Sequence, residues 1–242
     1  MYKDQKGNNR FSCLAIIPAR GGSKRIPRKN VLDFCGLPII VYTIQAALKS
    51  GLFRQVIVST DDPEIAEVSK QFGAEIPFIR THSLADDYTP VSEVTLDALN
   101  QIDPEGTKFN FIAQLMSNCP LRTEEDIINS FTQFRTEDAD SQISITHYGW
   151  QNPWWAMKRD SRKMMHPIFE DRVKERSQDL PELFCPTGAI WWISADALRR
   201  EKTFHCENKT GWEIAWDHGV DIDTEDDWNM AEMLMKNRNG LL

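Results

Sequence analysis

Five positive side chains and no acidic one lie between Arg20 and Lys29, in the run RGGSKRIPRK. Gly21 and Gly22 permit positive φ angles and a close approach of the backbone, so successive N–H groups could point at an oxyanion. This combination predicts a polyphosphate site that suits a nucleoside triphosphate. The side chains expected to supply its positive charge are Arg20, Lys24, Arg25 and Lys29.

Two well-known phosphate loops do not match this basic run. It lacks the G-x-G-x-x-G spacing of a dinucleotide site, and the order Gly22-Ser23-Lys24 differs from the G-K-[ST] of a P-loop. A solvated face, a nuclear-localisation signal or a nucleic-acid patch is the simpler interpretation of a basic run. The glycine pair directly after an apolar strand favours the phosphate site instead.

The opposite charge gathers near the other end of the chain, where residues 210–235 hold eight acids and no lysine or arginine. Asp221 and Asp223 stand at positions i and i+2, so in an extended segment both carboxylates project from one face. Mg²⁺ typically takes one or two carboxylates together with phosphate oxygens and water. The pair is therefore a candidate magnesium site.

Three other interpretations use the same acidic letters. An EF-hand would need glycine where Asp226 stands. A phosphatase of the haloacid dehalogenase type would need its D-x-D-x-T motif after the first strand, whereas this segment follows the last one. Helix capping by Thr224, with the acids behind it at the positive helix end, is compatible with a metal site.

Alternating strands and helices must position these two charged runs. Residues 13–18 (CLAIIP) form an apolar run of strand length, residues 38–50 have helical spacing, and residues 56–60 (VIVST) form a second strand. The alternation continues with predicted helices at 63–72, 91–102, about 124–134 with Thr123 as its cap, and from about 225, and with predicted strands at 76–79, 111–116, 143–146 and 189–194.

This alternation predicts an α/β fold with a doubly wound, mostly parallel sheet. Such sheets bind ligands at the carboxyl ends of their strands. The basic run follows the first strand, and Asp221 and Asp223 come just before the last helix, so both runs are expected at that edge. Residues 11–242 are predicted to form a single domain, preceded by a polar tail at residues 1–10.

Residues 150–186 interrupt the alternation. They hold Trp150, Trp154 and Trp155, four prolines and a dense mixture of charges. We interpret this segment as an inserted arm, because an exposed aromatic cluster on an arm is typical of a partner surface, and symmetric dimerisation is its commonest use. The alternative is that the tryptophans cap the main core.

Composition excludes several classes of protein. The chain has 242 residues, 28 lysines and arginines against 36 acids, and a formal net charge of −8, which disfavours a general nucleic-acid binder. The N-terminal residues lack the apolar core of a signal peptide, and no apolar run is long enough to span a bilayer. Five scattered cysteines without a C-x-x-C pair argue against a disulfide framework or a zinc site. A soluble cytoplasmic protein without a membrane partner is expected.

Several motifs, taken in order, carry a family resemblance. The run IIPARGGSKRIPRKN resembles the nucleotide-binding signature of the CMP-sialic acid synthetases, the acylneuraminate cytidylyltransferases. The stretches VIVSTDDPEIAEVSKQFGAEIPFIR, CPLRT, RSQDLP, GAIW and DIDTEDDW follow in that family's order, so the similarity extends over residues 14–234. The resemblance implies a Rossmann-like nucleotidyltransferase fold, an arm that dimerises, and Mg²⁺-dependent transfer of CMP from CTP to the anomeric hydroxyl of a nonulosonic acid, with release of pyrophosphate.

The resemblance also implies roles for individual residues. Lys29 would be the main charge stabiliser, aided by Arg20, and Asp223 or metal-bound hydroxide would take the proton of the nucleophile. Asp221 and Asp223 would hold Mg²⁺. The implied nucleotide-binding residues are Ala19, Arg20, Gly21, Gly22, Ser23, Lys24 and Lys29, with Asn30 and Arg80 near the nucleoside. The sugar-site positions are Met116, Arg176, Gln178 and Thr187, and family members often lend arm residues to the partner's sugar site.

Departures from the family pattern fall at the sugar site. Met116 replaces a glutamine that contacts the sugar in synthetases for N-acetylneuraminate, and Cys185-Pro186-Thr187-Gly188 replaces arginine-proline-asparagine-glycine. We therefore expect retained CTP chemistry and an altered nonulosonic acid, such as legionaminic or pseudaminic acid. The alternatives are a Kdo-type cytidylyltransferase, a non-catalytic nucleotide-sugar-binding module, and a phosphohydrolase that uses Asp221.

Overall fold

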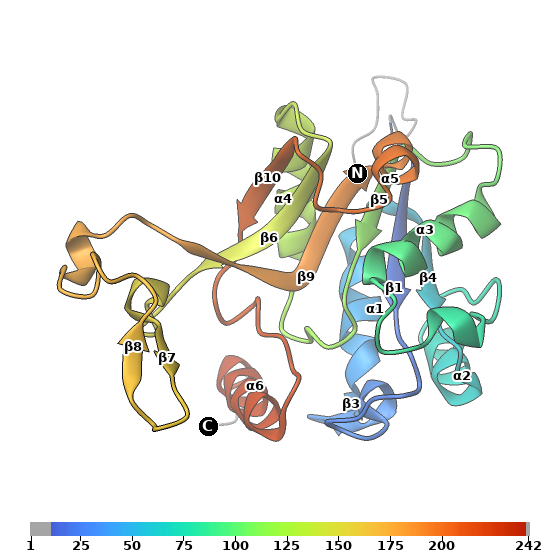
Figure 1. Cartoon of the computed structure of the whole chain (residues 1–242). Coiled ribbons are helices and arrows are strands. Elements are labelled where there is room, and N and C mark those ends of the chain that lie inside the picture. Colours follow the sequence, from blue (N-terminus) through green and yellow to red (C-terminus); the bar gives the residue numbers. More distant parts are fainter. Residues whose placement is uncertain (1–10, 241–242) are drawn as a thin grey trace.

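The structure is a computed structural model that describes residues 11–240, so the predicted tail at 1–10 lies outside the described residues. A six-stranded sheet with the order β10-β6-β9-β5-β1-β4 forms its centre (Figure 1). Its strands are β1 (Cys13–Pro18), β4 (Phe53–Ser59), β5 (Phe111–Gln114), β6 (Ser141–His147), β9 (Phe184–Ser194) and β10 (Lys209–Glu213). The helices are α1 (Ile39–Ser50), α2 (Pro63–Gln71), α3 (Val91–Ile102), α4 (Glu124–Thr136), α5 (Ala195–Glu201) and α6 (Glu225–Arg238).

Helices cover both faces of the sheet because β1 is apolar at every position and buried throughout. Ala15 and Ile17 belong to the core that includes residues of α1, α2 and α4, while Leu14 and Ile16 belong to the core shared with α3 and α5. Alternate side chains of one strand thus enter two cores, as a central parallel strand requires. The carboxyl end of β1 therefore lies in the middle of the sheet.

The α/β fold with a mostly parallel sheet is confirmed, with one antiparallel strand. β1 pairs in parallel with β4 and β5, and β10 with β6, whereas β9 runs antiparallel to both β5 and β6. The reason lies in the connection: the chain leaves β6, runs out through residues 148–183, and returns at the same end of the sheet. β9 must then run opposite to β6.

One predicted strand is wrong. Residues 76–79 form no strand; the segment makes only a single parallel bridge between Glu75 and Ile57 and one further hydrogen bond from Arg80 N to Thr60 O. Pro77 lacks the N–H that a ladder would need here. The predicted helices agree closely with α1 to α4 and α6, and Thr123 and Thr224 both form capping boxes.

Two elements of the main body and two small hairpins were not predicted. β10 (KTGWE) has no apolar run, and its Gly211 lies so close to β6 that a Cβ there would meet the Ile145 side chain at 2.5 Å. α5 is only seven residues long and is capped by Ser194. The hairpins are β2 (Asp33–Phe34) with β3 (Leu37–Pro38), and β7 (Met157–Arg159) with β8 (Met165–Pro167).

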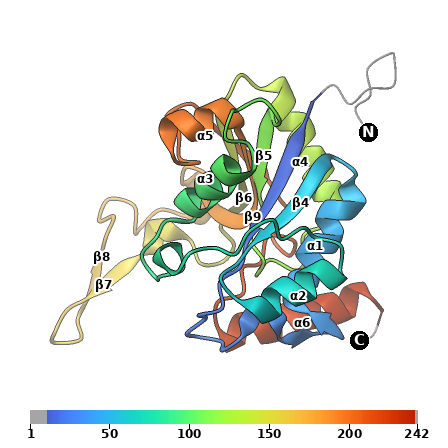
Figure 2. The same cartoon turned by 90° about the vertical axis from the view of Figure 1, so that its right-hand side faces the viewer.

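Residues 150–183 extend away from the sheet and carry the β7–β8 hairpin, whereas 184–186, the end of the predicted arm, already pair with β6 as part of β9 (Figures 1 and 2). Trp154 packs edge-on against Phe169 and donates its indole N–H to Pro181 O at 2.8 Å, so this tryptophan holds the arm together. Trp150 is 87% exposed. The tryptophans of this segment therefore do not cap the main core.

Candidate functional site

The basic loop leaves the carboxyl end of β1 and is held by the neighbouring strand. Ala19 N donates to Ser59 O at 3.0 Å, which continues the β1–β4 pairing, and Gly21 N donates to the Asp61 carboxylate at 3.0 Å. A Cβ on Gly21 would meet the Asp62 carboxylate at 2.7 Å, so the close approach of this loop to the start of α2 requires glycine.

The expected cradle of free backbone N–H groups is only partly correct. The N–H groups of Gly21 and Ser23 are engaged by Asp61 and by Gly21 O, and the glycines with positive φ in residues 11–240 include neither Gly21 nor Gly22. The loop instead offers its cationic side chains. Attraction for an anion here comes chiefly from side-chain charge rather than from a nest of amides.

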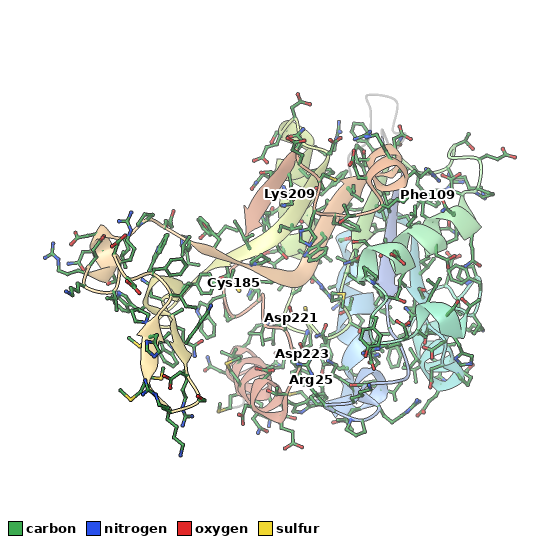
Figure 3. All side chains as sticks on the ribbon, in the orientation of Figure 1. Arg25, Phe109, Cys185, Lys209, Asp221 and Asp223 are labelled. Carbon is green, nitrogen blue, oxygen red and sulfur yellow. The ribbon has the colours of Figure 1, made fainter. Side chains whose placement is uncertain are left out.

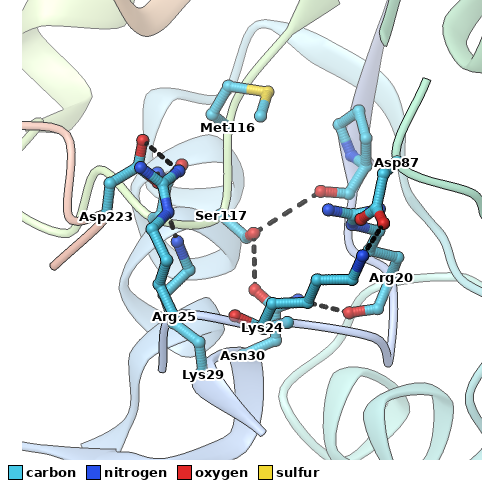
Figure 4. Close-up of a pocket in the computed structure, with 12 residues that line it drawn as sticks. Arg20, Lys24, Arg25, Lys29, Asn30, Asp87, Met116, Ser117 and Asp223 are labelled. Atoms are coloured by element: carbon cyan, nitrogen blue, oxygen red, sulfur yellow. Dashed lines mark hydrogen bonds and ion pairs between the residues drawn. The ribbon is translucent and has the colours of Figure 1, made fainter. Parts of the chain in front are cut away.

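The cationic side chains line a cavity of about 420 Å³, which we call the first cavity (Figure 4). Arg20 and Lys24 pair with Asp87, while Arg25 and Lys29 pair with Asp223, so two carboxylates divide the four cations into two pairs. The complete lining is Pro18, Arg20, Ser23, Lys24, Arg25, Lys29, Asn30, Asp87, Met116, Ser117, Asn118 and Asp223.

Lys29 occupies the deepest position among these cations, with a side chain only 13% exposed. Its Nζ donates to Ile222 O at 2.6 Å and to the Asp223 carboxylate at 3.1 Å. Arg25 contacts the other oxygen of Asp223 at 2.8 Å. The basic run and the acidic segment therefore meet at Asp223, although nearly 200 residues separate them in the sequence.

Asn30 fixes the shape of the basic loop. Its amide donates to Arg20 O at 2.9 Å, and its oxygen accepts from the Ser117 hydroxyl at 2.7 Å. The side chain lines the first cavity but is buried, so the structure places it as a brace between the two ends of the loop and the segment that follows β5.

A second cavity of about 270 Å³ adjoins the first and shares Met116, Asn118 and Asp223 with it. It contains two of the predicted sugar-site residues, Met116 and Thr187. Half of its lining residues are apolar or glycine and half carry amide, hydroxyl or carboxylate groups. The complete lining is Val91, Gln114, Met116, Asn118, Pro186, Thr187, Gly188, Trp191, Asp221 and Asp223.

Asp221 and Asp223 both line the second cavity, at the carboxyl edge of the sheet, while Phe109 and Lys209 lie at the opposite edge (Figure 3). Asp221 accepts from Gly188 N at 3.0 Å and from the Cys119 thiol at 2.7 Å. Burial raises the pKa of Cys119 well above its usual value, so the thiol stays protonated as a donor.

Two hard carboxylate donors facing one cavity beside a cationic loop fit a Mg²⁺ that also binds phosphate. Within residues 11–240 there is no group of three or more histidine, cysteine or acidic side chains that could hold a metal ion. A metal here would therefore need substrate oxygens or water to complete its shell.

Six predicted site residues line neither cavity: Ala19, Gly21 and Gly22 of the loop backbone, and the side chains of Arg80, Arg176 and Gln178. Arg80 is buried beside the loop, 3.5 Å from the Asp61 carboxylate, and burial lowers its pKa. Arg176 and Gln178 lie on the arm, where both are exposed and Arg176 pairs with Asp179 at 2.7 Å. The structure thus does not bring these arm residues to the site of their own chain.

Asp87 and Arg122 were not predicted as residues of the site. Asp87 belongs to the segment between Arg80 and α3 and carried no recognisable motif. Arg122 is 2% exposed and donates to Met116 O at 3.1 Å, to Ala189 O and to the Thr43 hydroxyl. It lies in the quoted motif CPLRT, but nothing in those letters reveals that it ties two walls of the second cavity together.

No helix within residues 11–240 is both long and apolar enough to cross a membrane. All five cysteines lie in this part of the chain and are free thiols.

Curated proteins similar to this chain share a type of reaction in their names. The pseudaminic acid cytidylyltransferase of Campylobacter jejuni is 32% identical over 223 residues, which cover 92% of this chain and 96% of that protein. The CMP-N,N'-diacetyllegionaminic acid synthase of Legionella pneumophila is 32% identical over 232 residues, with the same coverage of both. The N-acylneuraminate cytidylyltransferase of Streptococcus agalactiae is 30% identical over 89% of this chain and 51% of its own length.

Solved structures show the same fold. A CMP:2-keto-3-deoxy-manno-octonic acid synthetase in complex with CTP superposes with a TM-score of 0.71 at 17% identity, over 94% of this chain and 99% of that one. A cytidylyltransferase from Leptospira borgpetersenii gives a TM-score of 0.56 at 15% identity, over 96% and 97% of the two chains. The family model described as cytidylyltransferase matches residues 14–180, which confirms the resemblance found in the motifs. The chain belongs to the cytidylyltransferase family.

Proposed function

We propose that this enzyme transfers CMP from CTP to the anomeric hydroxyl of a nonulosonic acid and releases pyrophosphate. The observation that carries the proposal is the pair of adjoining cavities that meet at Asp223. One is lined by cations suited to a triphosphate, and the other combines apolar side chains with the amide, hydroxyl and carboxylate groups that can hydrogen-bond a sugar. Relatives named for pseudaminic, legionaminic and N-acylneuraminic acids support the sugar class.

In the proposed reaction the anomeric oxygen attacks the α-phosphorus in line with departing pyrophosphate, so catalysis consists mainly of positioning and charge neutralisation. Arg20, Lys24 and Arg25 would hold the triphosphate in the first cavity. Lys29, fixed by Ile222 O and Asp223 between the two cavities, would neutralise the charge that develops during transfer. Asp223 borders both ligands and would accept the proton of the sugar hydroxyl.

Asp221 and Asp223 would hold Mg²⁺ when CTP is bound. The ion supplies positive charge to the phosphate oxygens. The chain's own contribution is to orient the two carboxylates. Gly188 N and the Cys119 thiol fix Asp221, and Lys29 and Arg25 fix Asp223 in the free enzyme.

The active unit in this proposal is a homodimer formed through the arm. Arg176 and Gln178 lie on the arm, outside the cavities of their own chain, so they could reach a sugar only in a second copy. Large apolar side chains on the same arm support a partner surface. Those with 46–87% exposure are Trp150, Met157, Met164, Met165 and Ile168. Five free thiols support a reducing cytoplasm as its location.

The proposal is tested by pyrophosphate release from the purified full chain with CTP and Mg²⁺. The acceptors are pseudaminic, legionaminic and N-acetylneuraminic acids, with Kdo as the eight-carbon comparison. We expect turnover with one of the nine-carbon acids and little with Kdo. Turnover confined to Kdo would favour the Kdo-type alternative, and silence with all acceptors would favour a binding module. Phosphate release from a monoester without CTP would favour a phosphohydrolase.

A further inference from the structure

The segment between Arg80 and α3 reaches over the basic loop and places a carboxylate on two of its cations. Asp87 contacts Arg20 at 2.8 Å and Lys24 through its second oxygen (Figure 4). Arg20 also donates to Asp86 O at 2.7 Å. Hydrogen bonds from Lys24 and Arg20 hold the pKa of the Asp87 carboxyl below its usual value. Asp87 is therefore an anion bound in the first cavity by the chain itself.

We infer that Asp87 occupies a phosphate position and that a triphosphate binds by displacing it from Arg20 and Lys24. This inference rests on the proposed function only in taking a polyphosphate as the ligand of the first cavity. A phosphate carries more charge and more acceptor oxygens than a carboxylate, so the two cations gain stronger hydrogen bonds in the exchange. The free enzyme avoids four unpaired cations in one cavity.

Other contacts show that the displaced segment can keep its own shape. The Asp86 carboxylate accepts from Tyr88 N at 2.9 Å and from Thr89 N at 2.7 Å, which closes a turn within the segment. Its ends are fixed by Arg80 N bound to Thr60 O and by the start of α3 at Val91. Asp87 itself is 32% exposed, so its side chain can leave the cations without opening the core.

Asp223 plays the matching role on Arg25 and Lys29, but its setting differs. It also borders the second cavity and is a proposed magnesium ligand, so it keeps a function after the nucleotide binds. Asp87 lines only the first cavity. Removing the Asp87 charge should therefore favour the ligand, because the competing anion is lost and no proposed catalytic group changes.

The test measures binding of inorganic tripolyphosphate by calorimetry, without divalent cations, to the full-length protein and to Asp87→Asn. The variant should bind about threefold to tenfold more tightly, since two partly exposed ion pairs no longer compete. Asp86→Asn is the matched control: it removes the same charge one residue away and keeps the Oδ1 that accepts from Tyr88 and Thr89. It should change the affinity by at most about twofold.

Cytidine separates direct competition from a general effect of the segment, because cytidine has no phosphate. Its affinity should be the same in the wild type and in Asp87→Asn. The inference is overturned if Asp86→Asn raises the affinity for tripolyphosphate as much as Asp87→Asn does, or if Asp87→Asn raises the affinity for cytidine equally. It is also overturned if Asp87→Asn leaves the affinity for tripolyphosphate unchanged. In each case the proposed function still stands. If neither protein binds tripolyphosphate, the inference and the proposed nucleotide site fail together.

Discussion

The two cavities share Asp223, but their walls differ in chemistry and in the parts of the chain that supply them. The first takes its four cations from one loop of ten residues, and two carboxylates hold those cations in place. The second takes its walls from β5, α3, β9 and the segment before α6, and those walls combine apolar side chains with amide, hydroxyl and carboxylate groups. Charge chemistry thus resides in a short local run, whereas shape selectivity depends on contacts between distant parts of the chain.

The strongest test of this division is Asp223→Asn, because Asp223 is the carboxylate at the border of both cavities. If it accepts the proton of the sugar hydroxyl, kcat should fall by about 10²- to 10⁴-fold, measured as pyrophosphate release at saturating CTP and Mg²⁺. Asp226→Asn removes a charge from the same acidic segment outside both cavities and should leave kcat near the wild-type value. A fully active Asp223→Asn would exclude this residue as the base.

Lys29→Met removes the most buried cation of the first cavity. Loss of a stabiliser of transition-state charge should lower kcat/KM for CTP by about 10²- to 10³-fold, with an unchanged circular dichroism spectrum. Arg28→Met is the control from the same loop, since Arg28 lies outside the cavity and pairs with Asp62 and Glu64. Equal losses in both variants would mean that the loop acts through its total charge.

Thr43→Val probes the second cavity from behind its wall. The Thr43 hydroxyl accepts from Arg122 and donates to Met116 O at 3.3 Å, so valine leaves a buried N–H unpaired. Unfolding free energy should fall by about 1–3 kcal/mol, and KM for the sugar should rise while KM for CTP stays constant. Thr136→Val, at the exposed end of α4, should change neither the unfolding free energy nor the KM for the sugar. A rise in both KM values would show that the two cavities are not separable.

The smallest effect is expected for Cys119→Ser. Serine also donates to Asp221, so kcat/KM should stay within about twofold of the wild type, whereas Cys119→Ala, which loses the donor at 2.7 Å, should lose more. The comparison is made at several Mg²⁺ concentrations, because a loosened Asp221 should raise the concentration required. Equal activity of the serine and alanine variants would show that the thiol does not orient this carboxylate.

The sequence predicted the first cavity better than the second for the same reason. RGGSKRIPRK and DIDTEDDW are contiguous, and the position of each next to a strand or helix end is a local property, so Lys29 and Asp223 could be placed at one sheet edge in advance. The ion pairs of Asp87 and the burial of Arg122 depend on contacts across 60 or more residues. No spacing rule contains that information.

The fold shows the same limit. Strong apolar periodicity located β1 and α1 to α4, but the direction of β9 depended on where the arm returns to the sheet. β10 was not predicted because it is half exposed and contains Gly211, which allows the close approach of β6. A strand whose residues pack against a neighbouring strand and not into a core lacks the apolar pattern from which strands are predicted.

Strand β9 begins on the arm at Phe184, forms a wall of the second cavity at Pro186–Gly188 and ends in the main core at Ser194. β9 is one continuous strand of eleven residues, although its pairing with β6 shifts register between Pro186 and Trp191, so the arm is joined to that wall without a separate loop. Substitutions in the arm that improve assembly would then alter the second cavity, and substitutions in the second cavity would alter the arm. Arm and pocket should accordingly diverge together between relatives, as one heritable module, while the basic loop varies independently.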